Sequence, residues 1–139
     1  MTVSAPRDYV IPLFISGNAR DGTITENIDK SEAHMLEGNW KFCISSLNLT
    51  LSETIANPTH ATLSTNLCWN HKGQPSIIHV FIVKGRPSDQ LAILSSRSLD
   101  WIDISRPTNQ VELFFRDLER NNTLPVKKVH AVILLRRIG

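Results

Sequence analysis

The amino-acid sequence predicts an all-β protein, a two-sheet antiparallel sandwich of about eight strands folded as a single jelly roll. Short segments in which apolar and polar residues alternate recur along the chain, at spacings typical of a sandwich or barrel. Turn-forming residues separate these segments, and no stretch has a convincing amphipathic helical pattern. Eight strands in two sheets with long cross-connections form a jelly roll. An immunoglobulin-type sandwich fits the strand number equally well, but its Cys…Trp…Cys order is absent.

Length and composition predict one domain, 1–139, with an ordinary hydrophobic core. A domain of this size buries roughly 68–70% of its unfolded surface, and an apolar content of 41% is not that of a disordered chain. No apolar run approaches the ~20 residues that cross a bilayer. Residues 1–7 lack the apolar region of a signal peptide. We therefore expect a soluble protein that is not secreted and has no membrane partner.

The first third of the chain predicts two strands. Residues 8–16 alternate between two faces, and Pro12 places this strand at a sheet edge or at a bulge, because proline cannot donate a ladder hydrogen bond. Residues 23–28 form a weaker, more polar strand after the Asp21-Gly22 turn. Residues 29–34 have some helical tendency but are too few and too polar to form a packed helix, so we expect a loop or a single turn.

The stretch 36–51 predicts a long, bent core strand. Trp40, Phe42 and Ile44 share one face, and the parity of the apolar residues then flips to Leu47, Leu49 and Leu51. One extra residue near 45–46, a β-bulge, would return the leucines to the same core. The alternative is a strand that crosses from one layer of the sandwich to the other.

The middle of the chain predicts a loop, two strands and a turn. Residues 52–60 look like a loop because Asn57-Pro58 stops regular structure. Residues 61–69 alternate as a half-buried strand, and a turn follows at 70–76. Residues 77–83 are a continuous, β-branched apolar run, which is typical of a strand with both faces covered.

The last third predicts two short pieces and a closing hairpin. Residues 91–94 are a short apolar piece, and residues 99–104 alternate between two faces. Residues 110–117 and 126–138 are two longer strands that we expect to form a hairpin. The final strand is apolar on both faces, so it is either central in the sandwich or seated in a subunit interface.

The two predicted strands 77–83 and 126–138 are apolar on both faces. They leave apolar surface uncovered, since a small two-layer sandwich should keep its outer faces polar. Another copy of the chain would cover that surface, so we expect a homo-oligomer. The candidate interface residues lie on 77–83 and on the final strand: Ile78, Val80, Ile82, Val132 and Leu134.

Positive charge is concentrated at the end of a chain whose net charge is only +2. From residue 106 onward there are seven Lys or Arg and three acidic residues. This segment could contact nucleic acid through counterion release, which would suit a small nucleic-acid-binding β-barrel. The alternative is an ordinary solvated face. The candidate nucleic-acid-facing residues are Lys127, Lys128, Arg136 and Arg137.

The sequence contains no recognisable catalytic or metal-binding motif. Cys43 and Cys68 lie in apolar strands without a CxxC pair, so we expect buried free thiols. We expect a protein that is not an enzyme and needs no cofactor. One alternative is a cellular oligomeric β-sandwich that binds a protein or glycan ligand through the 52–60 and 85–90 loops.

Two segments resemble a known family. Residues 35–47 (MLEGNWKFCISSL) resemble the "L-E-G-x-W-x-hydrophobic" segment of the penton-like single-jelly-roll minor capsid proteins of Polinton/Maverick elements, adintoviruses and related double-stranded DNA viruses. Residues 111–117 and 132–137 are similar to that family's closing hairpin, whose final strand ends in basic residues.

The resemblance implies a structural virion protein with no active site. It implies a ring of five subunits at an icosahedral vertex, made in the cytoplasm or nucleus of a host cell. It also implies a major capsid protein as the partner at the flanks of the ring. The basic terminal segment could then face the genome.

Overall fold

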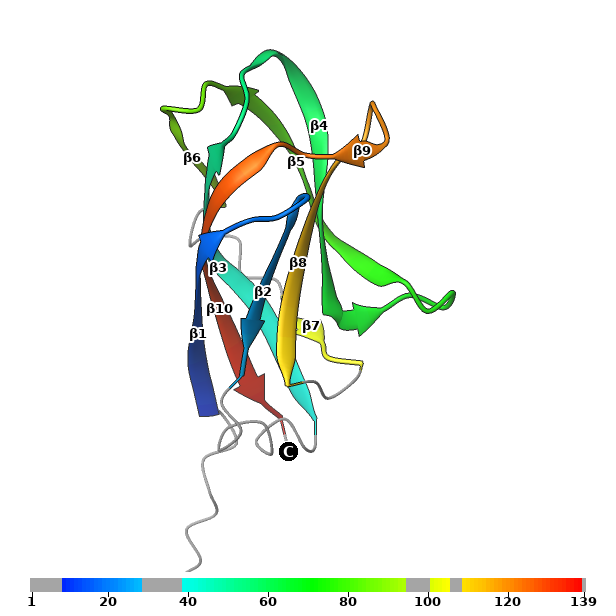
Figure 1. The fold of residues 1–139 in the computed structure, drawn as a ribbon. Coiled ribbons are helices and arrows are strands. Elements are labelled where there is room, and N and C mark those ends of the chain that lie inside the picture. The colour runs from blue at the N-terminus through cyan, green and yellow to red at the C-terminus, as the bar shows by residue number, and fades with distance from the viewer. Residues whose placement is uncertain (1–8, 29–38, 95–100, 106–108, 139) are drawn as a thin grey trace, which may run out of the picture.

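The computed structural model describes residues 9–28, 39–94, 101–105 and 109–138, which form two antiparallel sheets packed face to face (Figure 1). The strands of sheet A, in spatial order, are β1 (Tyr9–Asn18), β10 (Val126–Arg137), β3 (Trp40–Leu51) and β6 (Gln90–Leu94), with β7 (Ile102–Asp103) paired to β3. The strands of sheet B are β2 (Thr23–Asn27), β8 (Gln110–Asp117), β4 (Ile55–Trp69) and β5 (Pro75–Gly85), with β9 (Asn122–Thr123) paired to β8.

The strand pairing is nested, and this nesting is what makes the fold a jelly roll. Strand β1 pairs with β10, β2 with β8, β3 with β6, and β4 with β5. Among the longer strands, the first therefore pairs with the last, the second with the last but one, and so on inward. The pairs β10–β3 and β8–β4 then join the halves into two sheets. The predicted all-β, two-sheet jelly roll is confirmed.

The β-bulge predicted in the long third strand is present. In β10 the consecutive residues Val132 and Ile133 lie opposite Ser46 and Ile44, which leaves Ser45 as the extra residue of β3. Apolar side chains on both sides of the bulge are therefore buried in one core: Trp40, Phe42, Ile44, Leu47, Leu49 and Leu51.

The hydrophobic core lies between the two sheets and is built from the inward residues of both. Ile133 of β10 and Phe42 of β3 come from sheet A, and Leu63 of β4 and Phe115 of β8 come from sheet B; all four are fully buried. Inward-facing residues of two aligned sheets interdigitate in this way in a sandwich.

Proline correctly indicated an edge strand in β1. Among the described strands, β1 pairs with β10 alone, and Pro12 lies opposite Leu134. Because no described strand pairs with the other side of β1, the N–H group that Pro12 lacks is not needed for a hydrogen bond there.

The predicted closing hairpin of residues 110–117 and 126–138 is wrong, because β8 and β10 lie in different sheets. After β8 the chain pairs briefly back through β9 and then crosses to sheet A. The crossover is anchored by the buried Leu124 and Val126. Both strands carry the same inward apolar stripe, so periodicity could not assign them to separate sheets.

Two predictions for the middle of the chain are also corrected. The segment 52–60 is not a loop throughout, because β4 begins at Ile55 and Pro58 lies where the β4–β5 register shifts between Ile55 and Thr59. The run 77–83 is not covered on both faces, because Val80 and Ile82 are more than half exposed on the outer face of sheet B, whereas Phe81 is buried. Strand β5 is also an edge strand of that sheet. The strand buried throughout is its neighbour β4, over residues 61–68.

Some predictions fall wholly or partly outside the described residues. The segment 29–34 does so entirely. Of 99–104, residues 101–104 are described, and within them the strand is confined to Ile102–Asp103.

Candidate interaction surfaces

An apolar strip lies along β5 on the outer face of sheet B. Val80 and Ile82 are opposite Thr62 and His60 of β4, and their side chains are 52% and 61% exposed. Ile77, opposite Ser64, is 59% exposed. We call Ile77, Val80 and Ile82 the β5 strip.

The predicted interface residue Ile78 does not belong to this strip. The β4–β5 register shifts between Leu63, opposite His79, and Ser64, opposite Ile77, so Ile78 is an extra residue in β5. Its side chain is half-buried and packs against the hydrophobic core. The bulge therefore exchanges the roles that strict alternation gave to Ile77 and Ile78.

A second apolar surface lies on the outer face of sheet A. Leu134 is half-buried there, opposite the exposed Pro12 of β1, and Val10 is 43% exposed at the next outward position. We call Val10, Pro12 and Leu134 the β1–β10 patch. Val132, the other predicted interface residue of β10, lies beside it and opposite Phe14.

The four predicted nucleic-acid-facing residues do not form one cluster. Lys128 and Arg136 occupy the same face of β10 but are eight residues apart, which is about 27 Å along a strand. Lys127 is the extra residue at the register shift between Val126 and Lys128, and Arg137 has the opposite parity to Arg136. The Arg136 guanidinium lies 5.6 Å from the ring centroid of Trp101, a cation–π contact.

The outer face of sheet A is hollowed near Lys128. The hollow has a volume of about 590 Å³ and lies over β1, β10, β3 and the start of β6. Phe14 lies at its border with its side chain 68% exposed, and the Ser16 hydroxyl lies 3.0 Å from Nε2 of His130. The other polar side chains that line it are Ser46, Asn48, Thr50, Gln90 and Lys128.

Sequence reasoning missed this hollow. Residues 8–16 alternate between two faces, and this alternation alone does not show which face is buried. The sequence does carry one signal, which is the position of Phe14 in the alternation. Phe14 lies on the same face of the strand as Pro12, opposite to the face of the fully buried Ile15. An edge strand with an aromatic residue on its second face exposes that residue unless another element covers it.

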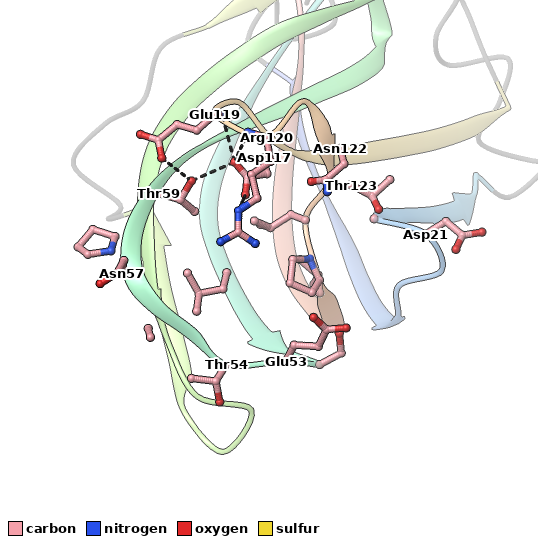
Figure 2. A pocket seen from close by; sticks show the side chains of 18 residues that line it. Asp21, Glu53, Thr54, Asn57, Thr59, Asp117, Glu119, Arg120, Asn122 and Thr123 are labelled. Carbon is pink, nitrogen blue, oxygen red and sulfur yellow. Dashed lines mark hydrogen bonds and ion pairs between the residues drawn. The ribbon is translucent and has the colours of Figure 1, made fainter.

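A polar pocket of about 620 Å³ lies between the start of β4 and the β8–β10 crossover (Figure 2). Residues 52–59 line one side of it, and residues 85–90 do not line it. The Thr59 hydroxyl lies 2.9 Å from Oδ1 of Asp117 and 3.0 Å from Oε2 of Glu119. A hydroxyl carries one proton, so Thr59 can donate fully to only one of the two carboxylates at a time.

The Asp117 carboxyl group accepts hydrogen bonds from three residues of its own chain. Burial alone would raise the pKa of its carboxyl group. The Arg120 N–H, the Thr59 hydroxyl and the Glu119 N–H donate hydrogen bonds to it, and together they lower the pKa below its ordinary value. These donors fix the turn after β8, so the carboxylate stabilises structure and its Oδ1 is not free for catalysis.

Glu119 forms the exposed half of this cluster. Its Oε1 lies 3.0 Å from Nδ1 of His60. This contact, followed by the Thr59 hydroxyl, lowers the pKa of the Glu119 carboxyl group. Both side chains are about half exposed, and a polar contact in such a position contributes little to stability.

The cysteine prediction is confirmed. Cys43 and Cys68 are buried free thiols, and burial is the main cause that raises the pKa of each. In the described part of the chain no group of three or more His, Cys, Asp or Glu side chains is placed to hold a metal ion. The same residues include no helix that could span a membrane.

No protein-family model matches the chain, and no curated protein matches it. One similar solved structure is the virus-like particle of the extra small virus of the giant freshwater prawn Macrobrachium rosenbergii, at 12% identity and a TM-score of 0.36, covering 99% of this chain and 84% of that one. Another is a mutant VP2 protein of infectious bursal disease virus in T=1 particles, at 12% identity and a TM-score of 0.22, covering 97% of this chain and 41% of that one. Similarity at this level does not indicate a function.

Proposed function

We propose that this protein is a structural subunit of a viral capsid, a penton-like minor capsid protein that assembles with copies of itself into rings of five. The observation that carries the proposal is the pair of uncovered apolar surfaces on the two opposite outer faces of a jelly roll. A contact between two different surfaces of identical subunits is heterologous, and it generates a ring when the rotation closes.

The size of the surfaces favours a closed ring over a pair. Full burial of an exposed Val or Ile side chain stabilises a contact by roughly 1.5–3 kcal/mol. The three residues of the β5 strip are only 52–61% exposed in the free subunit, so covering them supplies a little over half of the sum for three side chains, about 3–5 kcal/mol. This gain lies near the low end of the roughly 4–15 kcal/mol cost of association. One such contact would be weak. In a ring every subunit makes two contacts, and no apolar surface remains at an open end.

The fold alone does not assign the function, because jelly rolls serve many roles. The capsid assignment comes from the resemblance of residues 35–47 to the penton-like family. The same resemblance implies that the second partner is a major capsid protein and that the protein is located in the virion. The absence of a cofactor and of enzymatic activity belongs to the same proposal.

Sedimentation velocity combined with negative-stain microscopy tests the proposal. The wild-type protein should form rings or closed particles at high concentration. Ile82→Lys and Leu134→Lys each place a charge in one of the two surfaces and should shift the protein towards monomers. Ile82 is 61% exposed, so its replacement should leave the circular-dichroism spectrum unchanged.

Ile138→Lys is the matched control, because Ile138 is 43% exposed but belongs to neither surface. It should assemble as the wild type does. A wild-type protein that stays monomeric at high concentration would overturn the proposal. Equal losses of assembly in Ile138→Lys and Ile82→Lys would overturn the role of the β5 strip.

A further inference from the structure

We infer that the hollow on the outer face of sheet A binds single-stranded nucleic acid, with Phe14 stacking on a base and Lys128 contacting a phosphate. This binding function goes beyond self-assembly. It rests on the chemistry of the face and not on the capsid proposal.

The charge of sheet A fits a polyanion. Its described strands contain five Lys or Arg residues and His130, whereas their only acidic residue is Asp103. Of these basic residues, Lys128 and His130 line the hollow. Asp103 lies opposite Lys41 at the other end of β3, where its Oδ1 is 3.8 Å from Nζ of Lys41. None of the described residues that line the hollow is acidic, and Lys128 is exposed there. A phosphate would therefore meet a cation and no opposing carboxylate.

The aromatic residue at the border favours nucleic acid over other polyanions. Phe14 is 68% exposed on an edge strand, which leaves its ring accessible from solvent. Proteins that bind single strands without sequence preference combine a positive groove with such aromatic platforms, because every base has a flat face.

The remaining polar groups suit the sugar-phosphate backbone. Ser46, Asn48 and Thr50 are alternate residues of β3 and so point to one face, and Gln90 lies opposite Thr50 in β6. Hydroxyl and amide side chains of this kind make many of the contacts that position a nucleic-acid backbone. They follow the strand direction, so an extended single strand could run along them.

Fluorescence anisotropy of a labelled oligothymidylate of about ten nucleotides tests the inference on the full chain, at several salt concentrations. Wild-type affinity should fall as salt rises. Lys128→Gln should weaken binding and reduce the slope of log affinity against log salt by about 0.7, the value for one phosphate contact on a single strand. Phe14→Ala should weaken binding at least about fivefold, and Phe14→Tyr should restore it.

Lys84→Gln is the matched control, because Lys84 is an exposed strand lysine on β5 of the other sheet. It should bind as the wild type does. Absence of wild-type binding at low salt, or an equal effect of Lys84→Gln and Lys128→Gln, would overturn the inference. So would full competition by heparin together with unchanged binding by Phe14→Ala, which would indicate a general polyanion surface.

Sedimentation of the same samples separates this inference from the capsid proposal. A monomeric protein that binds the oligonucleotide through Phe14 would keep the inference and overturn the proposed self-assembly. An assembling protein that binds no oligonucleotide would do the reverse. If Phe14→Ala disrupts assembly and leaves binding intact, the hollow is a contact between copies and the inference is wrong.

Discussion

Ile44 and Leu47 both point into the core although they lie three positions apart on one strand. Strict alternation would place them on opposite faces of the sheet. Ser45 is the extra residue that restores the common face, because Val132 and Ile133 of β10 lie opposite Ser46 and Ile44. One unpaired serine therefore joins two apolar series of opposite parity into a single core.

Deletion of Ser45 should prevent folding, whereas Ser45→Ala should not. Without the extra residue, either Trp40, Phe42 and Ile44 or Leu47, Leu49 and Leu51 would turn to the outer face. Ser45 is itself only half-buried, so its replacement by alanine should change the free energy of unfolding by about 0.5 kcal/mol or less. Circular dichroism and soluble yield distinguish the two variants. A deletion variant with a wild-type unfolding midpoint would contradict the role of the bulge.

The parts of the fold that sequence predicted are those that local periodicity determines. The bulge in β3 appears as a parity change within a dozen residues, and the edge position of β1 appears as a single proline. The pairing of β10 with β1 and with β3 leaves no signal in the local sequence. Strand β10 and strand β1, for example, are more than a hundred positions apart in the chain. A row of apolar residues on one face predicts that a strand faces the core, but it does not indicate to which of the two sheets the strand belongs.

The candidate surfaces were predictable only in outline. The sequence correctly placed Val80 and Ile82 in an apolar strand, but a bulge exchanged Ile77 and Ile78, and no pattern marks a bulge inside an unbroken apolar run. The basic residues were counted along the chain, whereas the extended geometry of β10 separates Lys128 from Arg136. Contacts such as that between Thr59 and Asp117 depend on the register of β4 and β8, which only the fold supplies.

Gly22→Ala should destabilise the protein more than Gly73→Ala. Both glycines adopt positive φ values, +70° and +78°, and a non-glycine residue in this conformation costs roughly 1–2 kcal/mol. At Gly22 an added Cβ would also lie 2.6 Å from the carbonyl oxygen of Phe115, whereas Gly73 has open space around it. Chemical denaturation of the two variants compares the free energies of unfolding. Equal losses would show that the backbone around Gly22 moves away freely.

Asp117→Asn should lower stability at neutral pH, and the loss should shrink in acid. The carboxylate is 5% exposed and accepts hydrogen bonds that an amide oxygen accepts less strongly, so we expect a loss of roughly 1–3 kcal/mol. Because the folded pKa lies below the unfolded value of about 3.9, the contribution of the charge is fully present above that value. It disappears as the pH falls from there through the folded pKa.

Thermal unfolding of wild type and variant at one protein concentration, from pH 7 to pH 3, measures the difference. Glu53→Gln, an exposed change in the same pocket, should stay within about 0.5 kcal/mol of wild type. A difference for Asp117→Asn that grows towards pH 3 would contradict the assignment.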